Sequence, residues 1–528
     1  MDILKIYSQA LAEFKAGNYQ KALSIQAKLK KIAPTWTKNL LLEAYVYRAQ
    51  NLHEKEISAI EKFLPKINLS EPAEKNLAAV AYSLLAATYR IIGDPKKAVK
   101  FFIKSAELES DFKRSCVEIS NAIFAANDDE NFSADDFQKL YALYQNKISD
   151  IKTFPQKIYN HDKIKIGYLS ADFHEHPVTT FAWSLLGEHD KNNFEVYCYS
   201  AGGKKDWLTE KIIEAVDIFR DISNLSDFEA AEKIREDEID ILFDLSGHTS
   251  GNRLLAAAYR PATIQISGIG YMNSTGLNCF DYFLSDKFCK GDWEKYFVEK
   301  VIELPHSHFC YTPLKKFPEP SDAPCMKNKF VTFGVFNNYN KINDFMLQVW
   351  KKILDAVPNS RLIFKHQILG NAEGKKIVAE RLKKFNFDLS RVELRGFTEN
   401  YLDEYSEIDI ALDTFPYTGG LTTCESIFSG VPVISLYGER HGTRFGLSIL
   451  SNAGIGELAC STVEEYISRA AGLAQDFELL SILHKNLRQM MKNSPLMDFK
   501  NYVREVEEIF SEKLQTKKEL GNVVNGDS

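Results

Sequence analysis

The chain has 528 residues, too many for one hydrophobic core, so about three domains are expected. Hydrophobic residues make up 45% and charged residues 26%, as in an ordinary soluble protein, and the net charge of −7 argues against nucleic acid as the main partner. The first residues, MDILKIYSQALAEF, have no basic region followed by a long apolar stretch, so no secretory signal is expected. No stretch approaches the roughly 20 apolar residues of a membrane span, and the cysteines are scattered singly. We therefore expect a cytoplasmic protein with reduced thiols and no membrane span.

Residues 1–155 are expected to form tetratricopeptide-like helical repeats. Gly17 and Pro34 have the spacing of one such unit, in which small residues let two antiparallel helices pack closely and proline ends the second helix. Weaker copies begin at Asn51 and Gly93. A plain helical bundle is the alternative, because the middle copy is degenerate. A repeat array would present a concave surface of the kind that binds peptides.

From residue 162 onward, strands alternate with helices, which predicts parallel α/β sheets. Two lobes are expected, 162–312 and 326–512, joined by the proline-rich connector PLKKFPEPSDAP. A last helix should cover 502–513, and the polar tail 513–528 is expected to be disordered. Two such lobes in tandem suggest a site between the carboxyl ends of their strands.

The stretch 413–434, DTFPYTGGLTTCESIFSGVPVI, predicts a strand end, a loop, a short helix and the next strand. The loop contains Gly419 and Gly420, and Thr422 stands where a helix N-cap is expected. Free N–H groups at such a helix start attract a phosphate. The alternative is an ordinary strand-to-helix turn.

Glu425 has two readings that the sequence leaves open. Thr422 and Glu425 have the T-x-x-E spacing of a capping box, in which both side chains satisfy backbone donors at the helix start. A glutamate one turn into a helix that faces a cleft can instead accept hydrogen bonds from the two hydroxyls of a ribose.

A second candidate group lies in the stretch FNNYNKIN, where Asn338 and Lys341 fall between a strand and a helix that begins near Asn343. A lysine in this position can offer a positive charge to a diphosphate leaving group. The alternative is a lysine that only faces solvent.

Two histidines follow strands of the first lobe. His176 comes after KIKIGYLS, where Pro177 forces it into an extended conformation, and His248 comes after IDILFDLSG. A neutral histidine at a strand end can act as a general base towards an acceptor hydroxyl or hydrogen-bond a sugar. Many loop histidines do neither.

Metal binding is not expected. His174 and His176, and likewise His306 and His308, have ligand-like spacing, but no cysteine or carboxylate set accompanies them at a recognisable interval. The lobes also lack an Asp-x-Asp pair that could hold a divalent cation on a diphosphate.

The stretches YLSADFHEHPVTTF, DLSGHTSGNR, YRPATIQISGIGYMNSTG, FNNYNKI and DTFPYTGGLTTCESIFSGVP together resemble the O-linked N-acetylglucosamine transferase and SPINDLY family of protein glycosyltransferases. The resemblance covers roughly 163–510 and implies a GT-B fold. It also implies a nucleotide-sugar donor held mainly by the second lobe, and inverting transfer to a protein hydroxyl without a metal or other cofactor. The partners would be a nucleotide-sugar and a protein acceptor bound by the repeats and the cleft.

The resemblance also implies residue roles. Lys341 becomes the diphosphate contact and Asn338 its neighbour in the donor site. Glu425 becomes a ribose ligand, and Thr422 and Thr423 become phosphate contacts. His176 and His248 match the family's histidines on the acceptor side, and which group takes the acceptor's proton stays open.

Three positions depart from the animal enzymes. Asn338 replaces a glutamine, Gly420 replaces a histidine, and Tyr401 falls about where those enzymes have a histidine that contacts the base. The donor thus stays open between UDP-N-acetylglucosamine, UDP-glucose and GDP-fucose. Asn-linked transfer and an inactive repeat adaptor are the alternatives to transfer onto serine or threonine.

Overall fold

The computed structural model describes residues 2–526, with side chains described up to residue 520. The chain divides into two compact units: the first comprises Met1–Asp129, Asn338–Lys351 and Ile363–Glu399, and the second comprises Glu130–Asn337, Lys352–Leu362 and Asn400–Ser528. None of the described helices has both the length and the apolar content that crossing a membrane requires.

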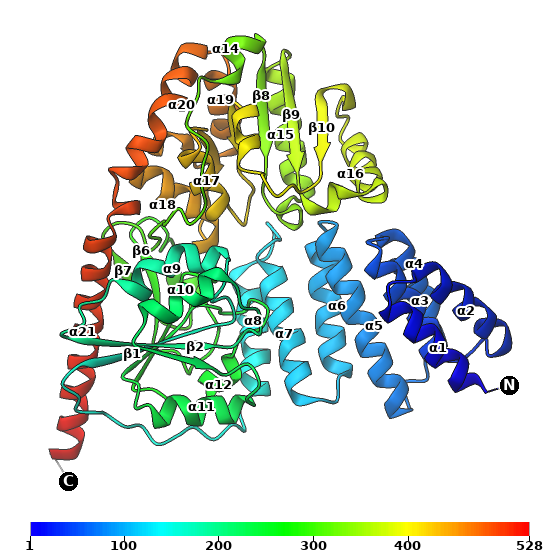
Figure 1. The fold of residues 1–528 in the computed structure, drawn as a ribbon, viewed down its shortest axis with the longest axis horizontal. Helices are drawn as coiled ribbons and strands as arrows, with labels where there is room; N and C mark the ends of the chain where they lie inside the picture. The colour runs from blue at the N-terminus through cyan, green and yellow to red at the C-terminus, as the bar shows by residue number, and fades with distance from the viewer. Residues whose placement is uncertain (1, 527–528) are drawn as a thin grey trace. The chain divides into compact units, whose positions relative to one another are not determined.

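The first unit begins with helices that pack against their neighbours in sequence (Figure 1). They are α1 (Ile3–Lys15), α2 (Tyr19–Ile32), α3 (Thr37–Ala49), α4 (His53–Phe63), α5 (Pro72–Ile91), α6 (Pro95–Leu108) and α7 (Phe112–Ala126). Small residues such as Ala22, Ala44 and Ala98 are fully or almost fully buried between them, which allows close approach of the helix backbones. This is the helix-pair packing of tetratricopeptide-like repeats.

Three residues that occupy corresponding positions in the expected repeats share one backbone conformation. Gly17, Asn51 and Gly93 follow α1, α3 and α5 with φ of 78°, 55° and 83°. After each, the next residue donates its N–H five residues back, from Asn18 to Glu13, from Leu52 to Tyr47 and from Asp94 to Tyr89. These are Schellman turns, which need a residue that tolerates the left-handed region, and asparagine is the usual substitute for glycine there. The degenerate middle copy therefore keeps the turn of the other two.

The first sheet has seven strands in the order β3-β2-β1-β4-β5-β6-β7, and every pair is parallel. The central strands β4 and β5 are buried at every residue, so their side chains do not alternate between core and solvent. Their bounds are β1 (Ile164–Ser170), β2 (Phe194–Ser200), β3 (Ile218–Asp221), β4 (Ile241–Asp244), β5 (Ile264–Gly268), β6 (Tyr282–Asp286) and β7 (Lys300–Leu304). The helices of this region are α8 (Ala134–Lys147), α9 (Pro177–Gly187), α10 (Trp207–Ala215), α11 (Asp227–Glu236), α12 (Leu254–Ala258) and α13 (Trp293–Tyr296).

The second sheet repeats this topology with six strands in the order β10-β9-β8-β11-β12-β13. In both sheets the first strand along the chain lies beside the fourth, as in dinucleotide-binding folds. The strands are β8 (Val331–Val335), β9 (Ser360–Lys365), β10 (Val392–Arg395), β11 (Ile410–Leu412), β12 (Val433–Leu436) and β13 (Ala459–Cys460). The helices are α14 (Pro324–Asn328), α15 (Asp344–Ala356), α16 (Ala372–Lys384), α17 (Leu421–Phe428), α18 (Phe445–Asn452), α19 (Val463–Leu473) and α20 (Phe477–Lys492). Two sheets of this topology are the two-lobed GT-B architecture.

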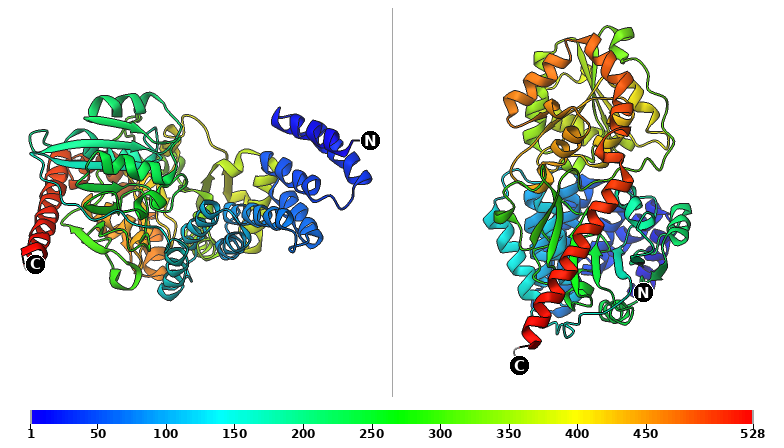
Figure 2. Two further views of the ribbon diagram at one scale, coloured as in Figure 1. Left: turned by 90° about the horizontal axis from the view of Figure 1, so that it is seen from below. Right: turned by 90° about the vertical axis from the view of Figure 1, so that its left-hand side faces the viewer.

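The last helix, α21 (Phe499–Gly526), returns to the first sheet (Figure 2). Phe510 packs edge-on against Phe243 of β4, and Glu507 accepts a hydrogen bond from His189 at 2.9 Å. The expected disordered tail from residue 513 is wrong as far as Gly526, because the stretch QTKKEL continues the helix with good helix formers and Leu514 is buried. Residues 527–528 of that tail lie outside the described residues.

The expected repeat domain 1–155 includes α8, but this helix does not belong to the same unit as the repeats. It belongs to the second unit, where Tyr144 packs edge-on against His248 and Tyr141 covers Gly276. The proposed boundary at residue 155 is therefore not a break in packing.

Candidate functional site

Each sheet has one place where neighbouring strands send their chains in opposite directions, and ligands bind in the crevice that this opens. In the first sheet this switch point lies between β1 and β4, and in the second between β8 and β11. The loops after β1 and β4 carry His176 and His248. Those after β8 and β11 lead to Asn337 and Asp413. The sequence-predicted loops thus lie at the two switch points.

Asp413 organises the switch point of the second sheet, and it is buried with 2% of its surface exposed. Its Oδ1 accepts hydrogen bonds from Asn337 Nδ2 at 3.0 Å and from Gly419 N at 2.8 Å. Its Oδ2 accepts one from Ser435 Oγ of β12 at 2.7 Å. One carboxylate at the end of β11 is therefore hydrogen-bonded to β12, to the loop after β8 and to the glycine loop. Sequence reasoning missed Asp413 and Asn337, although a carboxylate ending a buried strand was a usable signal.

The loop places the start of α17 one residue after Gly420, which is the N-cap and brings no side-chain cap. Thr422 lies inside the first turn, so its prediction as N-cap is wrong. The first backbone bond of the helix runs from Cys424 N to Gly420 O at 3.1 Å. The N–H groups of the first turn therefore lack a capping side chain, and the helix dipole makes this end attractive to an anion.

Only glycine fits at position 419. A Cβ there would lie 2.5 Å from Thr422 Oγ1 and 2.6 Å from Thr423 Oγ1. The Thr423 hydroxyl donates back to Gly419 O at 3.0 Å, and Asn337 Nδ2 donates to Thr422 Oγ1 at 3.4 Å. The two threonines therefore support the loop, with the N–H groups of the helix start beside them.

Glu425 does not form a capping box. Its Oε1 accepts a hydrogen bond from the Tyr401 hydroxyl at 2.5 Å, and the side chain is buried. Burial raises the pKa of Glu425 to about 7, although the Tyr401 hydrogen bond and the Lys315 charge oppose the rise. The capping reading is thus wrong, because Thr422 is not at the N-cap and the carboxyl group points to Tyr401. The hydroxyl of Tyr401 occupies a donor position that a ribose hydroxyl could take.

Lys315, from the connector, links the two switch points within the second unit. Its Nζ lies 2.9 Å from Glu175 Oε1 and 5.0 Å from the centre of the Tyr401 ring. Glu175 directly precedes His176. Sequence reasoning missed this lysine because the connector has no pattern that predicts its direction.

His176 is the more accessible of the two predicted histidines, with 36% of its side chain exposed. It is the N-cap of α9, in the extended conformation that Pro177 imposes, and Nδ1 accepts a hydrogen bond from Val178 N at 3.3 Å. Burial lowers its pKa despite the nearby Asp172 carboxylate. In the neutral ring the hydrogen therefore resides on Nε2, which can donate to a sugar or acceptor oxygen.

His248 is buried, with 1% of its surface exposed. Its Nε2 donates to Thr275 O at 2.8 Å, and its ring packs edge-on against Tyr144 and Tyr271. Burial lowers the pKa of His248 to about 4, so the ring is neutral at pH 7. In this arrangement the side chain holds the loop after β4, and it has no exposed face with which to take a proton from an acceptor.

Lys341 and Asn338 belong to the first unit, where they lie at the end and the N-cap of the short helix η2 (Tyr339–Lys341). Lys341 is partly exposed and Asn338 is exposed. Between them, Tyr339 is buried and accepts a hydrogen bond from Arg381 Nη1 at 3.3 Å. Arg381 Nη1 also donates to Ile92 O at 3.2 Å. The third repeat therefore fixes the segment that carries Lys341.

Comparison with known proteins agrees with this fold. The sequence profile described as Glycosyl transferase family 41 matches residues 138–323 and 321–506. A probable UDP-N-acetylglucosamine–peptide N-acetylglucosaminyltransferase SPINDLY from Hordeum vulgare is 37% identical over 386 residues, covering 71% of this chain and 40% of the relative. The protein of the same name from Arabidopsis thaliana is 39% identical over 341 residues, 63% of this chain and 37% of its own. The chain thus spans about 40% of the length of these curated relatives.

A solved structure matches over nearly the full length. A mutant of the Thermobaculum terrenum O-GlcNAc transferase superposes with a TM-score of 0.83 at 27% identity, covering 98% of both chains. The repeats and both lobes are therefore shared with that protein.

Proposed function

The chain belongs to glycosyl transferase family 41, and from this premise we propose that it transfers a sugar from a nucleotide-sugar to serine and threonine hydroxyls of protein acceptors. The proposed donor is UDP-N-acetylglucosamine, which the names of its relatives imply. The observation that carries the proposal is the uncapped start of α17 at the switch point of the second sheet. A helix start in that place suits the diphosphate of the donor.

The proposed roles follow the chemistry of an inverting transfer. The acceptor oxygen attacks the anomeric carbon from the face opposite the diphosphate, the bond to the diphosphate breaks, and the acceptor proton passes to water. The N–H groups of the α17 start and the Lys341 ammonium stabilise the charge that builds up on the diphosphate. Asn338 lies beside Lys341 in the donor site. This leaving group needs no metal in the proposal.

The nucleoside end of the donor is assigned to Glu425 and Tyr401. Glu425 accepts a hydrogen bond from Tyr401 in the described structure, and a ribose hydroxyl would replace or share that donor. A buried carboxyl group with a raised pKa, lying at a switch point, supports this assignment.

On the acceptor side we assign the contact to His176 rather than His248. The hydrogen of His176 is on Nε2, which suits donation to a sugar or acceptor oxygen, and His248 is buried against Thr275. His248 is assigned to positioning of the loop after β4. The repeats are proposed to recruit the polypeptide, and a cytoplasmic location remains our prediction.

The alternative donors are favoured by one observation at Gly420. A Cβ at this position would approach Phe181 no closer than 3.8 Å, so a methyl group would fit there. By the resemblance, this glycine stands where the animal enzymes have a histidine, so the surroundings of the donor differ at the start of α17. UDP-glucose or GDP-fucose transfer remains the second candidate.

Thermal unfolding with UDP-N-acetylglucosamine, UDP-glucose and GDP-fucose tests the donor. A donor at 100 times its Kd stabilises the folded protein by about 2.7 kcal/mol, so the true donor raises Tm and the others do not. Intact-mass analysis of acceptor proteins co-expressed with the chain then tests transfer. A mass increase of one N-acetylhexosamine per site is expected, and no mass increase with any donor supports the inactive adaptor.

Lys341→Ala tests the assigned chemistry. Transfer should be lost while Tm stays within a degree or so of the wild type, because Lys341 is partly exposed. The matched control is Lys352→Ala, at an exposed lysine of α15. Wild-type transfer by Lys341→Ala would end the assignment.

A further inference from the structure

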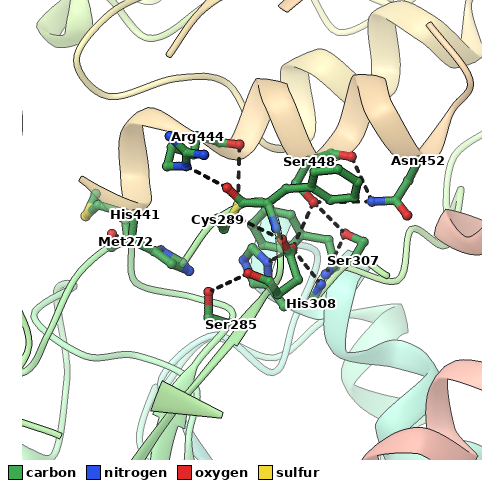
Figure 3. A network of polar contacts seen from close by, with 12 residues as sticks. Met272, Ser285, Cys289, Ser307, His308, His441, Arg444, Ser448 and Asn452 are labelled. Carbon is green, nitrogen blue, oxygen red and sulfur yellow. Dashed lines mark hydrogen bonds and ion pairs between the residues drawn. The ribbon is translucent and has the colours of Figure 1, made fainter. Parts of the chain in front are cut away.

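Three side chains that can bind metals meet inside the second unit (Figure 3). Cys289 follows β6, His308 follows β7, and His441 opens the short helix η6 (His441–Thr443) before α18. All three are at least 99% buried. Their ligand atoms lie within 4.8 Å of one another. The first two residues come from the first lobe and the third from the second lobe.

Both histidines leave one ring nitrogen without a partner among the described residues. The unpaired atoms are His308 Nε2 and His441 Nε2. An unpaired buried polar atom costs about 1–3 kcal/mol, and native structures contain few of them. Two such atoms beside the same thiol indicate that a ligand belongs between them.

The opposite ring nitrogens fix the direction of the free electron pairs. His441 Nδ1 faces Met272 O at 3.2 Å, and a carbonyl oxygen only accepts, so Nδ1 carries the hydrogen. His308 Nδ1 faces Asp286 Oδ2 at 2.6 Å and likewise donates. In the neutral rings, both Nε2 atoms then present lone pairs to the shared centre. A histidine held by a carboxylate or a carbonyl in this way is the usual surrounding of a metal ligand.

We propose that Cys289, His308 and His441 bind one Zn²⁺ ion, with water as the fourth ligand. One thiolate and two imidazoles are ligands that zinc prefers. Zinc bonds of about 2.0–2.3 Å place tetrahedral ligand atoms roughly 3.3–3.8 Å apart, so shifts of about 1 Å suffice. In the structure, the S–H hydrogen of Cys289 points to Arg444 O. When zinc binds, a sulfur–zinc bond replaces this S–H bond, and one proton leaves to solvent.

Two other readings fit less well. Cys289, His308 and Asp286 have the order of a nucleophile, base and orienting carboxylate, but their burial gives a substrate no access. A purely structural polar cluster would leave both Nε2 atoms unpaired. The catalytic reading does not use His441, whereas the metal site satisfies all three side chains.

The ion would join the two lobes next to the glycine loop. Gly442, the neighbour of His441, accepts hydrogen bonds from Thr418 N at 3.2 Å and Thr418 Oγ1 at 3.0 Å. Thr418 directly precedes Gly419. The site is therefore structural, and it acts on the position of the loop rather than on a reacting atom.

The test is metal analysis of the full chain purified without chelators or a histidine tag. The wild type should contain close to one zinc per chain, and Cys289→Ser and His441→Gln should lose it. The controls are Cys460→Ser and His484→Gln, at a buried thiol and at a buried histidine whose Nε2 is already paired with Asp409 O. Both controls should keep the zinc. Asp286→Asn, which changes the carboxylate that accepts from His308 Nδ1 and also from Cys289 N and Ser448 Oγ, should weaken zinc binding about 10–100-fold.

Cobalt binding to the wild type covers the case in which a variant does not fold. After removal of zinc, Co²⁺ should give the visible bands of a tetrahedral ion and a thiolate charge-transfer band, and zinc should abolish both. Wild-type protein that holds no zinc after incubation with it, and that gives no thiolate–cobalt band, overturns the proposal. Zinc that persists in both Cys289→Ser and His441→Gln lies elsewhere and overturns it equally.

Discussion

Replacement of Glu425 by glutamine should make the protein more stable above pH 7 and leave it nearly unchanged at pH 5. Glu425 is buried, and its pKa is raised from 4.5 to about 7. The folded state therefore keeps the proton at a pH where the unfolded chain has released it. Stability from this group is full below pH 4.5 and is lost as the pH rises to about 7.

The pKa values give the size of the effect. A rise from 4.5 to about 7 corresponds to roughly 3 kcal/mol of lost stability at pH 8. Glutamine has the same shape and no charge, and its carbonyl oxygen can still accept the Tyr401 hydrogen bond. The variant avoids the loss, and Tm should rise by about 2–4 °C for each kcal/mol in a cooperative unit of 150–250 residues.

The assay is thermal unfolding of both proteins between pH 5 and pH 8. Only the difference between them is read, because other buried carboxyl groups such as Glu118, whose pKa burial also raises to about 7, affect both proteins alike. Glu118→Gln should show the same pH dependence, and Glu232→Gln, at an exposed position of α11, should show none. Parallel Tm curves for Glu425→Gln and the wild type at every pH would refute the reasoning.

Three further outcomes follow from the packing. Gly93→Ala should cost about 1–3 kcal/mol, measured by urea unfolding, because φ is 83° and a Cβ would lie 2.7 Å from Ile342 O. Gly419→Ala should abolish the donor-induced Tm rise, since its Cβ would displace the neighbouring threonine hydroxyls, and retained donor binding would contradict the loop assignment. His176→Gln should lower transfer at unchanged Tm, whereas His248→Gln should lower Tm; the reverse pattern would exchange their roles.

The local features of the fold could be predicted from the sequence. Gly17, Asn51 and Gly93 mark the same turn in three helix pairs, because a left-handed residue after a helix is chosen by its own backbone. Alternating strands and helices predicted the two parallel sheets, and strand ends placed the loops of His176 and His248 at the switch points. These inferences need only periodicity and turn chemistry.

The direction of side chains depended on contacts between distant residues. Thr422 and Glu425 match a capping box in sequence, yet Tyr401, remote in the chain, takes the carboxyl group. His248 has the position of an acceptor-side base, yet Thr275 O and two tyrosines enclose it.

His308 shows the same limit most clearly. The sequence offered it no partner at a recognisable interval, and tertiary folding brings it together with Cys289 and His441. The sequence by itself therefore determined the repeats, the two sheets and the loops of the site, because backbone preferences act between neighbouring residues. Only the tertiary structure decided which side chains are buried and paired, because desolvation and hydrogen bonding depend on residues that the fold brings close.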